Sequence, residues 1–414
     1  MASRRAFLKN SAVAIFGAGA IPGWLSRSVY AAERFTQQRK KILVAIFQRG
    51  AVDGLNMVVP FAEPRYYELR PSIAIPRPDG TAETAVDLDG FFGLHPSLAP
   101  LKPMFDARQL AIVHAVGSPD PTRSHFDAQD YMESGTPGMK GTADGWMNRA
   151  LPKERGSESP VRAISLGESL PRCLRGRNDA VAVNNVNDFQ VHDPRGEAAF
   201  ESMYENTLDT VLHGTGQETF RAVKLLQSIQ RQPYAPENGA RYPNGKFGRG
   251  LQEVARLIKA DVGVEVAFAD IGGWDTHVNE TGAQPATGQL ANNLAQFGQA
   301  LAAFYQDMGD RMEDVALVTM SEFGRTAREN GDRGTDHGHA NVMFVMGGDV
   351  RGGKIYGDWP GLAEEQLYEG RDLALTTDFR DVLGELVVRH LGNQRVSAVF
   401  PGYENPKFRG LTGA

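Results

Sequence analysis

The sequence predicts an α/β fold built on a doubly wound, mostly parallel sheet. Short apolar runs, of the kind found in strands buried on both faces, alternate along the chain with segments whose apolar residues recur at helical spacing. Several of these runs are followed by Gly together with Asp, Glu or His, which is where open α/β sheets collect their functional groups. With 41% hydrophobic and 23% charged residues, the 414-residue chain has an ordinary globular composition.

The first 31 residues have the layout of a cleavable export signal. Twin arginines, Arg4 and Arg5, lie within SRRAFLK near the start, an apolar stretch covers residues 11–25, and the segment closes at Ala31. Gly and Pro inside the apolar stretch argue against a permanent membrane span, which needs about 20 apolar residues. We therefore predict a twin-arginine signal peptide over residues 1–31, passage through the twin-arginine translocase, a periplasmic or secreted location, and one α/β domain over residues 32–414.

The order of strands and helices follows from the hydrophobic pattern. Six apolar runs predict strands at residues 42–47, 110–116, 162–166, 264–270, 315–320 and 341–346. Helical spacing predicts helices at residues 251–258, 290–308 and 379–391. Residues 193–260 read as helical without an intervening strand, which predicts a helical cap or subdomain on the sheet.

Charge and cysteine content exclude several classes of function. The signal holds four Lys or Arg and no acidic residue, so the remaining chain has a net charge of −10 rather than −6. Such a chain is not expected to bind nucleic acid. Cys173 is the only cysteine, which excludes an internal disulfide and a cysteine-based zinc site.

Polar residues gather at the ends of the predicted strands. In chain order they are Asp53, Arg123, Ser124, His125, Asp275, His277, Glu322, Arg325, Asp336, His337 and His339. Carboxylates and imidazoles on tight turns are the ligands that hard or borderline divalent cations prefer. We predict a site for zinc, calcium, magnesium or manganese, with ligands among Asp53, Asp275, His277, Glu322, Asp336, His337 and His339. Any one of these side chains alone could instead cap a helix or form a hydrogen bond with the backbone of a loop.

Four motifs in combination resemble one family. GGWDTH at 272–277, SEFGRT at 321–326, TDHGH at 335–339 and GGKIYGDWPGL at 352–362 are similar to the domain of unknown function 1501 family. That resemblance implies a more distant likeness to the alkaline phosphatase superfamily, which includes sulfatases. It implies an alkaline-phosphatase-like sheet with metals at the strand ends and activity on phosphate or sulfate esters.

The resemblance leaves two alignments open. Asp336-His337-Gly338 spells the Asp-His-Gly turn of the superfamily, but it precedes a strand instead of following one. The alternative makes Glu322 the carboxylate ligand, with Phe323 in place of the histidine, and His337 or His339 the later ligand. Asp275 and His277 are closer together than in the superfamily, yet in an extended segment they would point to the same face.

Candidate catalytic residues lie before an apparent helix that runs through Met132. Ser124 is the expected nucleophile, and Thr122 is the second choice. A serine directly before a helix is also a common N-cap. His125 lies beside it, and Arg123 and Arg325 are expected to clamp the oxygens of a small anionic ester substrate.

Two functions have the strongest support. The first is an exported metal-dependent hydrolase of phosphate or sulfate esters. The second is a superfamily relative without catalysis that serves as a binding or assembly protein of the cell envelope. A metal-free hydrolase that uses His and Asp as acid and base is weaker, because no such pair is fixed by spacing.

Overall fold

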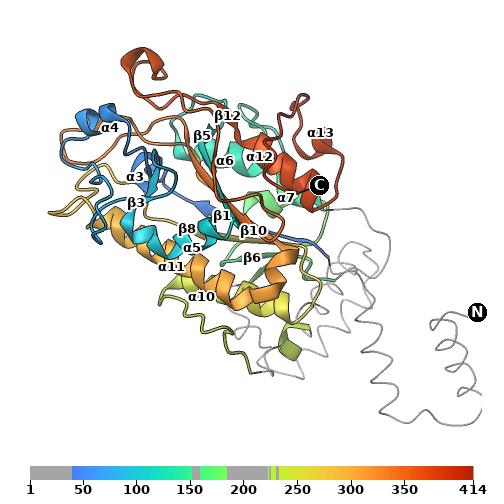
Figure 1. The fold of residues 1–414 in the computed structure, drawn as a ribbon. Helices are drawn as coiled ribbons and strands as arrows, with labels where there is room; N and C mark the ends of the chain where they lie inside the picture. The colour runs from blue at the N-terminus through green and yellow to red at the C-terminus, as the bar shows by residue number, and fades with distance from the viewer. Residues whose placement is uncertain (1–39, 152–158, 184–221, 223–224, 230–232, 414) are drawn as a thin grey trace, which may run out of the picture. The chain divides into compact units, whose positions relative to one another are not determined.

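A nine-stranded sheet forms the centre of the computed structural model, which describes residues 40–151, 159–183, 222, 225–229 and 233–413 (Figure 1). The strand order is β11-β5-β10-β9-β1-β8-β6-β7, and β12 also pairs with β5. The strands are β1 (Ile42–Gln48), β5 (Leu110–Gly117), β6 (Ala163–Leu166), β7 (Val181–Val183), β8 (Val266–Ile271), β9 (Val315–Met320), β10 (Asn341–Gly347), β11 (Ile355–Tyr356) and β12 (Thr377–Asp378).

Helices cover both faces of this sheet, so the doubly wound α/β fold class is confirmed (Figure 1). On β1, Val44 and Ile46 join a core with α10 (Lys246–Lys259) and α11 (Gln289–Met308). The alternate residues of β1 face the other core, with α6 (His125–Ser134), α7 (Trp146–Ala150) and α12 (Phe379–Glu385). Because side chains of a strand alternate between its two faces, a strand buried on both sides reads as a continuous apolar run.

Shorter elements complete the described chain. A three-stranded sheet joins β2 (Val58–Val59), β4 (Gly93–Leu94) and β3 (Val86–Asp87). The remaining α-helices are α3 (Gly54–Met57), α4 (Pro64–Leu69), α5 (Lys102–Asp106) and α13 (Val396–Val399). Short 3-10 helices lie at Pro96–Leu101, Arg172–Leu174, Gly309–Asp314 and Glu364–Gln366, and a π-helical turn at Leu386–His390 follows α12.

Strand β10 has the opposite direction to its neighbours, and this places the site. Its pairings with β9 and β5 are antiparallel, whereas the pairings of β1 with β8 and β9, and of β6 with β7 and β8, are parallel. The amino end of β10 therefore lies at the edge where β1, β8 and β9 end. The segment before Asn341 meets the segments after Gln48, Ile271 and Met320 at that edge.

The six predicted strands and three predicted helices are confirmed, with small shifts of their ends. Strand β8 begins at Val266 rather than at Val264. Within the predicted cap over residues 193–260, residues 193–221 lie outside the described residues, and α10 packs directly on the sheet core. The predicted signal peptide, residues 1–31, lies outside the described residues as well. Among the residues that the structure describes, no helix combines the length and the apolar character that crossing a membrane requires.

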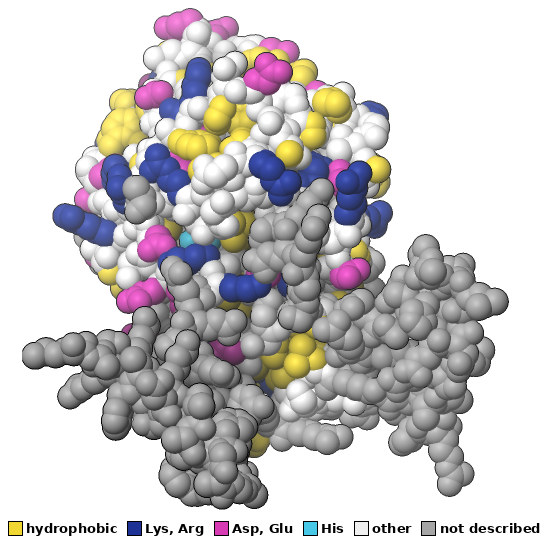
Figure 2. Space-filling model, turned by 90° about the vertical axis from the view of Figure 1, so that its right-hand side faces the viewer, with side chains coloured by type: hydrophobic (Ala, Val, Ile, Leu, Met, Phe, Trp, Pro, Cys, Tyr) yellow, Lys and Arg dark blue, Asp and Glu magenta, His cyan; other side chains and the backbone are white. Residues whose placement is uncertain are grey.

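The surface drawn in Figure 2 carries both signs of charge. Lys and Arg side chains on this face are interspersed with Asp and Glu.

Candidate metal centre

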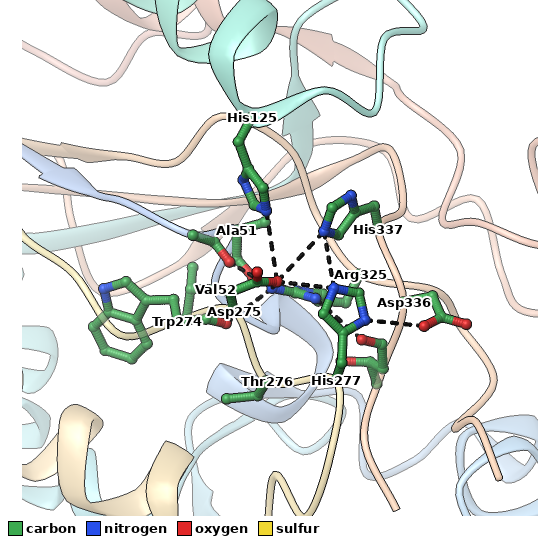
Figure 3. A network of polar contacts seen from close by, with 12 residues as sticks. Ala51, Val52, His125, Trp274, Asp275, Thr276, His277, Arg325, Asp336 and His337 are labelled. Atoms are coloured by element: carbon green, nitrogen blue, oxygen red, sulfur yellow. Dashed lines mark hydrogen bonds and ion pairs between the residues drawn. The ribbon is translucent and has the colours of Figure 1, made fainter. Parts of the chain in front are cut away.

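Three imidazoles and one carboxylate meet at the edge of the sheet where β1, β8 and β9 end (Figure 3). Asp275 Oδ1 lies 3.0 Å from His277 Nε2, 3.4 Å from His337 Nε2 and 3.5 Å from His125 Nε2. The Nε2 atoms of His277 and His337 lie 3.0 Å from each other. His125 is the first residue of α6, Asp275 and His277 follow β8, and His337 precedes β10. Three segments distant in sequence thus bring four donor atoms together, two of them from the segment after β8.

The second nitrogen of each ring is held by an oxygen. His125 Nδ1 donates to Glu322 Oε1 at 2.8 Å, His277 Nδ1 to Asp336 Oδ1 at 3.0 Å, and His337 Nδ1 to the carbonyl oxygen of Arg123 at 2.9 Å. Carboxylate and carbonyl oxygens only accept, so each Nδ1 carries the proton. Each Nε2 is then left with a lone pair directed at the common point. Metal-ligating histidines are held by the same arrangement of outer hydrogen bonds.

The donor atoms face one another as acceptors, which calls for a positive charge between them. A proton between His277 Nε2 and His337 Nε2 would satisfy that pair, whereas a divalent cation would serve the donor atoms of His125, Asp275 and His337, which all lie within 4.8 Å of one another. His125 Nε2 is buried and has no hydrogen-bond partner among the described residues. Zinc–nitrogen bonds of about 2.0–2.1 Å give a tetrahedral edge of roughly 3.3 Å. The spacings of Asp275 Oδ1 from His337 Nε2 and His125 Nε2, 3.4 and 3.5 Å, fit such an ion.

Glu322 is buried behind His125. Its Oε1 accepts from the backbone N–H of Gly50 at 2.8 Å, from His125 Nδ1 and from Gln129 Nε2 at 2.9 Å. Burial by itself raises the pKa of Glu322, but the hydrogen bonds from His125 and Gln129 outweigh it, so the pKa is lowered and the carboxylate is ionised. The hydrogen bond to Glu322 in turn raises the pKa of His125. Glu322, predicted as a ligand, thus orients the ring of His125 and makes it more basic.

Arg325 positions the carboxylate of Asp275. Its buried guanidinium donates to Asp275 Oδ1 at 2.6 Å and also to the carbonyl oxygens of Gly50, Ala51, Trp274 and Thr335. Burial alone raises the pKa of Asp275, but the hydrogen bond and charge of Arg325 outweigh it and lower the pKa to about 2. Because Arg325 uses its donors on the loops of the site, the structure does not present it as an oxyanion clamp.

Asp336, also predicted as a ligand, holds His277 Nδ1 instead, and the two remaining predicted ligands lie outside the cluster. Asp53 accepts from Leu55 N as the N-cap of α3 and forms a buried ion pair with Arg70. His339 is buried and stacks on Tyr368, with ring centroids 4.4 Å apart. Asp53 is thus satisfied by hydrogen bonds, and His339 packs on an aromatic ring, both outside the cluster.

Two predicted catalytic residues also have other partners. The guanidinium of Arg123 binds Asp372 at 2.7 Å and Glu369 at 2.7 Å, so only its backbone carbonyl serves the site. Ser124 is the N-cap of α6, and its Oγ accepts from Asp127 N at 3.5 Å. The helix-capping interpretation of Ser124 is therefore realised.

Gln129 is a site residue that the sequence reasoning missed. It lies four residues after His125 on α6, so both side chains share one helix face and both bind Glu322. That spacing was the available signal.

Residues 40–396 match the family described as "Protein of unknown function (DUF1501)". The chain belongs to this family. The resemblance drawn from the four motifs is thus confirmed, and the family's description assigns no activity. A search of curated proteins returned no match for this sequence.

Solved structures of the sulfatase and alkaline phosphatase group resemble the chain distantly. The PsFucS1 sulfatase from Pseudoalteromonas sp. has 13% identity and a TM-score of 0.39, with 94% of this chain and 78% of that chain covered. A protein in the alkaline phosphatase superfamily from Vibrio parahaemolyticus has 11% identity and a TM-score of 0.31, covering 77% and 62%. The C-terminal periplasmic domain of EcEptC from Escherichia coli, in complex with Zn, has 8% identity and a TM-score of 0.32, covering 75% and 73%. No residue role follows from similarities at this level.

Proposed function

We propose that this protein is an exported, metal-dependent hydrolase of phosphate or sulfate esters. The observation that carries the proposal is the convergence of His125 Nε2, His277 Nε2 and His337 Nε2 on Asp275 Oδ1, with every Nδ1 held by an oxygen. The donor set, imidazole nitrogen with one carboxylate oxygen, suits zinc better than calcium or magnesium. The twin-arginine motif at Arg4 and Arg5 supports export of the chain.

In this proposal His125, His337 and Asp275 hold the ion. His277, whose Nε2 lies 3.0 Å from Asp275 Oδ1, is the further proposed ligand. A bound divalent cation would supply Lewis-acid polarisation of the ester. Arg325 fixes the carboxylate of Asp275, and Glu322 fixes the ring of His125. Each ligand is thereby preorganised by a second residue, which limits the reorganisation needed when an ion binds.

Ser124 is the proposed nucleophile. It directly precedes His125, and it caps a helix of 10 residues whose amino-terminal N–H groups favour anions. The contact of its Oγ with Asp127 N is long, at 3.5 Å, and exposed, so the hydroxyl can turn away from it at small cost.

The second candidate is a binding or assembly protein of the cell envelope without catalysis. The pairing of Arg123 with Asp372 and Glu369, and the engagement of Arg325 by the loops, favour it. Both guanidinium groups predicted to clamp an ester have protein partners instead.

Metal content and esterase activity separate the candidates. The full chain is expected to retain zinc after purification and to hydrolyse a generic aryl phosphate or aryl sulfate. His337→Ala should lose the zinc and the activity together, because a side chain that binds the ion directly is removed. His339→Ala is the matched control: it removes a buried histidine two residues away that lies outside the cluster, and zinc content should not change.

Each outcome decides between the candidates. Zinc retained without hydrolysis of any ester in a broad panel would favour the binding protein. No divalent ion bound by the wild-type chain, even after addition of zinc, would refute the metal centre and with it the proposed hydrolase.

A further inference from the structure

A buried glutamate joins the two loops that carry the candidate metal centre. Glu280 Oε2 accepts from Thr276 Oγ1 at 3.1 Å and from Thr335 Oγ1 at 2.8 Å, and the Glu280 side chain is fully buried. Thr276 stands between Asp275 and His277, and Thr335 directly precedes Asp336. One carboxyl oxygen therefore holds the loop after β8 against the loop before β10.

Glu280 has the buried carboxylate of Asp53 in its neighbourhood. Asn56 Nδ2 donates to Glu280 Oε1 at 3.3 Å, and Asn56 Oδ1 accepts from Arg70, which forms the buried ion pair with Asp53. Asp53 already balances the charge of Arg70. Burial, and after it the charge of Asp53, raise the pKa of Glu280 well above its usual range. All three contacts of Glu280, from Thr276, Thr335 and Asn56, need only an acceptor.

We propose that Glu280 is a positioning residue that sets the spacing between His277 and the Asp336–His337 pair and thereby the affinity of the centre for its ion. This inference rests on the proposed metal centre. His277 Nε2 and His337 Nε2 come from the two loops that Glu280 joins, and they lie only 3.0 Å apart. Ligand positions must be held to about 0.2 Å, so a loop free to shift loses binding.

Glu280→Gln keeps the contacts on which this role depends, because the amide oxygen still accepts from the two threonines. The amide nitrogen cannot accept from Asn56 Nδ2, but that contact is long at 3.3 Å, and Asn56 Nδ2 also donates to the carbonyl oxygen of Ile73 at 3.1 Å. The variant should therefore bind zinc nearly as the wild type does. Glu280→Ala removes the carboxyl contacts between the two loops and leaves the backbone hydrogen bond from Thr335 N to Thr276 O in place. Thr335→Val removes one of the two hydroxyl donors to Glu280 without changing the side-chain shape.

Thr281→Val is the matched control. Thr281 is buried next to Glu280, and its hydroxyl has no hydrogen-bond partner among the described residues. Removing this hydroxyl takes away a buried polar atom close to Glu280 but leaves the hydrogen bonds of Glu280 with Thr276 and Thr335 intact.

The test is zinc titration of the full chain and its variants. Zinc affinity should fall roughly 10- to 100-fold in Glu280→Ala, the range typical for outer partners of metal ligands. Zinc affinity should fall by a smaller factor in Thr335→Val. It should stay within about threefold in Glu280→Gln and Thr281→Val, because both variants keep the hydrogen bonds from Thr276 and Thr335 to residue 280. Unchanged affinity in Thr335→Val overturns the proposal, and this variant decides if Glu280→Ala does not fold. An equal loss in Glu280→Gln and Glu280→Ala also overturns it, because the amide oxygen of the glutamine still accepts from both threonines.

A second readout needs no metal. In the zinc-free chain, the imidazole nitrogen resonances of His277 and His337 should shift in Glu280→Ala and Thr335→Val, and remain in place in Glu280→Gln and Thr281→Val. If the wild type binds no zinc, the proposed function fails, whereas the positioning role of Glu280 is still decided by these resonances. Identical histidine spectra in all variants would refute that role.

Discussion

Gly50→Ala should weaken metal binding although Gly50 contributes no ligand. Gly50 follows β1 with φ at +114°, and a Cβ built there would lie 2.9 Å from Asp275 N and 3.2 Å from Trp274 N. Both are backbone atoms, so no side chain can swing aside. Ordinary contact begins at 3.4 Å, so the loop bearing Asp275 must move by about 0.5 Å, more than the roughly 0.2 Å that a metal site tolerates.

The substitution also strains contacts that Gly50 itself makes. Its N–H donates to Glu322 and its carbonyl accepts from Arg325, so both residues that orient the ligands are affected. Zinc affinity should fall roughly 10- to 100-fold. The free energy of unfolding should fall by about 1–3 kcal/mol, the usual cost of a side chain in a strained backbone conformation.

Gly90→Ala separates strain from displacement. Gly90 also has a positive φ, +84°, but its Cβ would meet nothing within 4 Å. This control should lose stability to a similar degree, as measured by urea unfolding, and bind zinc as the wild type does. If Gly50→Ala and Gly90→Ala bind zinc with the same affinity, a side chain at position 50 does not displace Asp275, and the prediction is wrong.

Three further predictions concern export, chemistry and pH. Replacing Arg4 and Arg5 with Lys should leave the precursor in the cytoplasm in cell fractionation, and mature protein in the periplasm would contradict this. Ser124→Ala should abolish ester hydrolysis while zinc content is unchanged, and full activity would exclude this nucleophile. Burial lowers the pKa of His114 to about 4, so below pH 6.5 the unfolded state takes up a proton that the folded state refuses. Stability is therefore lost as pH falls, by about 1.4 kcal/mol between pH 7.5 and 5.5, and His114→Phe should remove that part of the pH dependence in urea unfolding; an unchanged dependence would contradict it.

The elements that the sequence predicted well are those buried on both faces. The runs at Ile42–Gln48 and Val315–Met320 are fully buried strands, and burial on both sides leaves a continuous apolar signal. Strand β7 has only three residues and two of them are half-buried, so it leaves no such signal.

The site was predicted in part because its residues sit at strand ends. What the sequence could not reveal was the direction of β10, which decides whether the TDHGH segment lies at the same edge as Glu322. With β10 antiparallel, both segments reach the site, and the two alignments that were open describe the same edge. Glu322 then holds His125 while His337 faces the common point.

Asp53 shows the opposite limit. Its position after a strand is that of a ligand, but its partner is Arg70, which folding brings to it as a buried ion pair. Charge pairing between loops is set by tertiary packing and leaves no periodic pattern in the sequence. The same holds for the bond between Arg325 and Asp275.

The proposed metal centre holds one divalent cation between the histidines and Asp275. Anomalous diffraction at the zinc edge, from crystals of the full chain grown with zinc, locates that cation. We predict a peak about 2.0–2.1 Å from the Nε2 atoms of His125 and His337, with Asp275 Oδ1 also in contact. Full anomalous occupancy elsewhere, with only hydrogen-bonded imidazoles at this point, would contradict it.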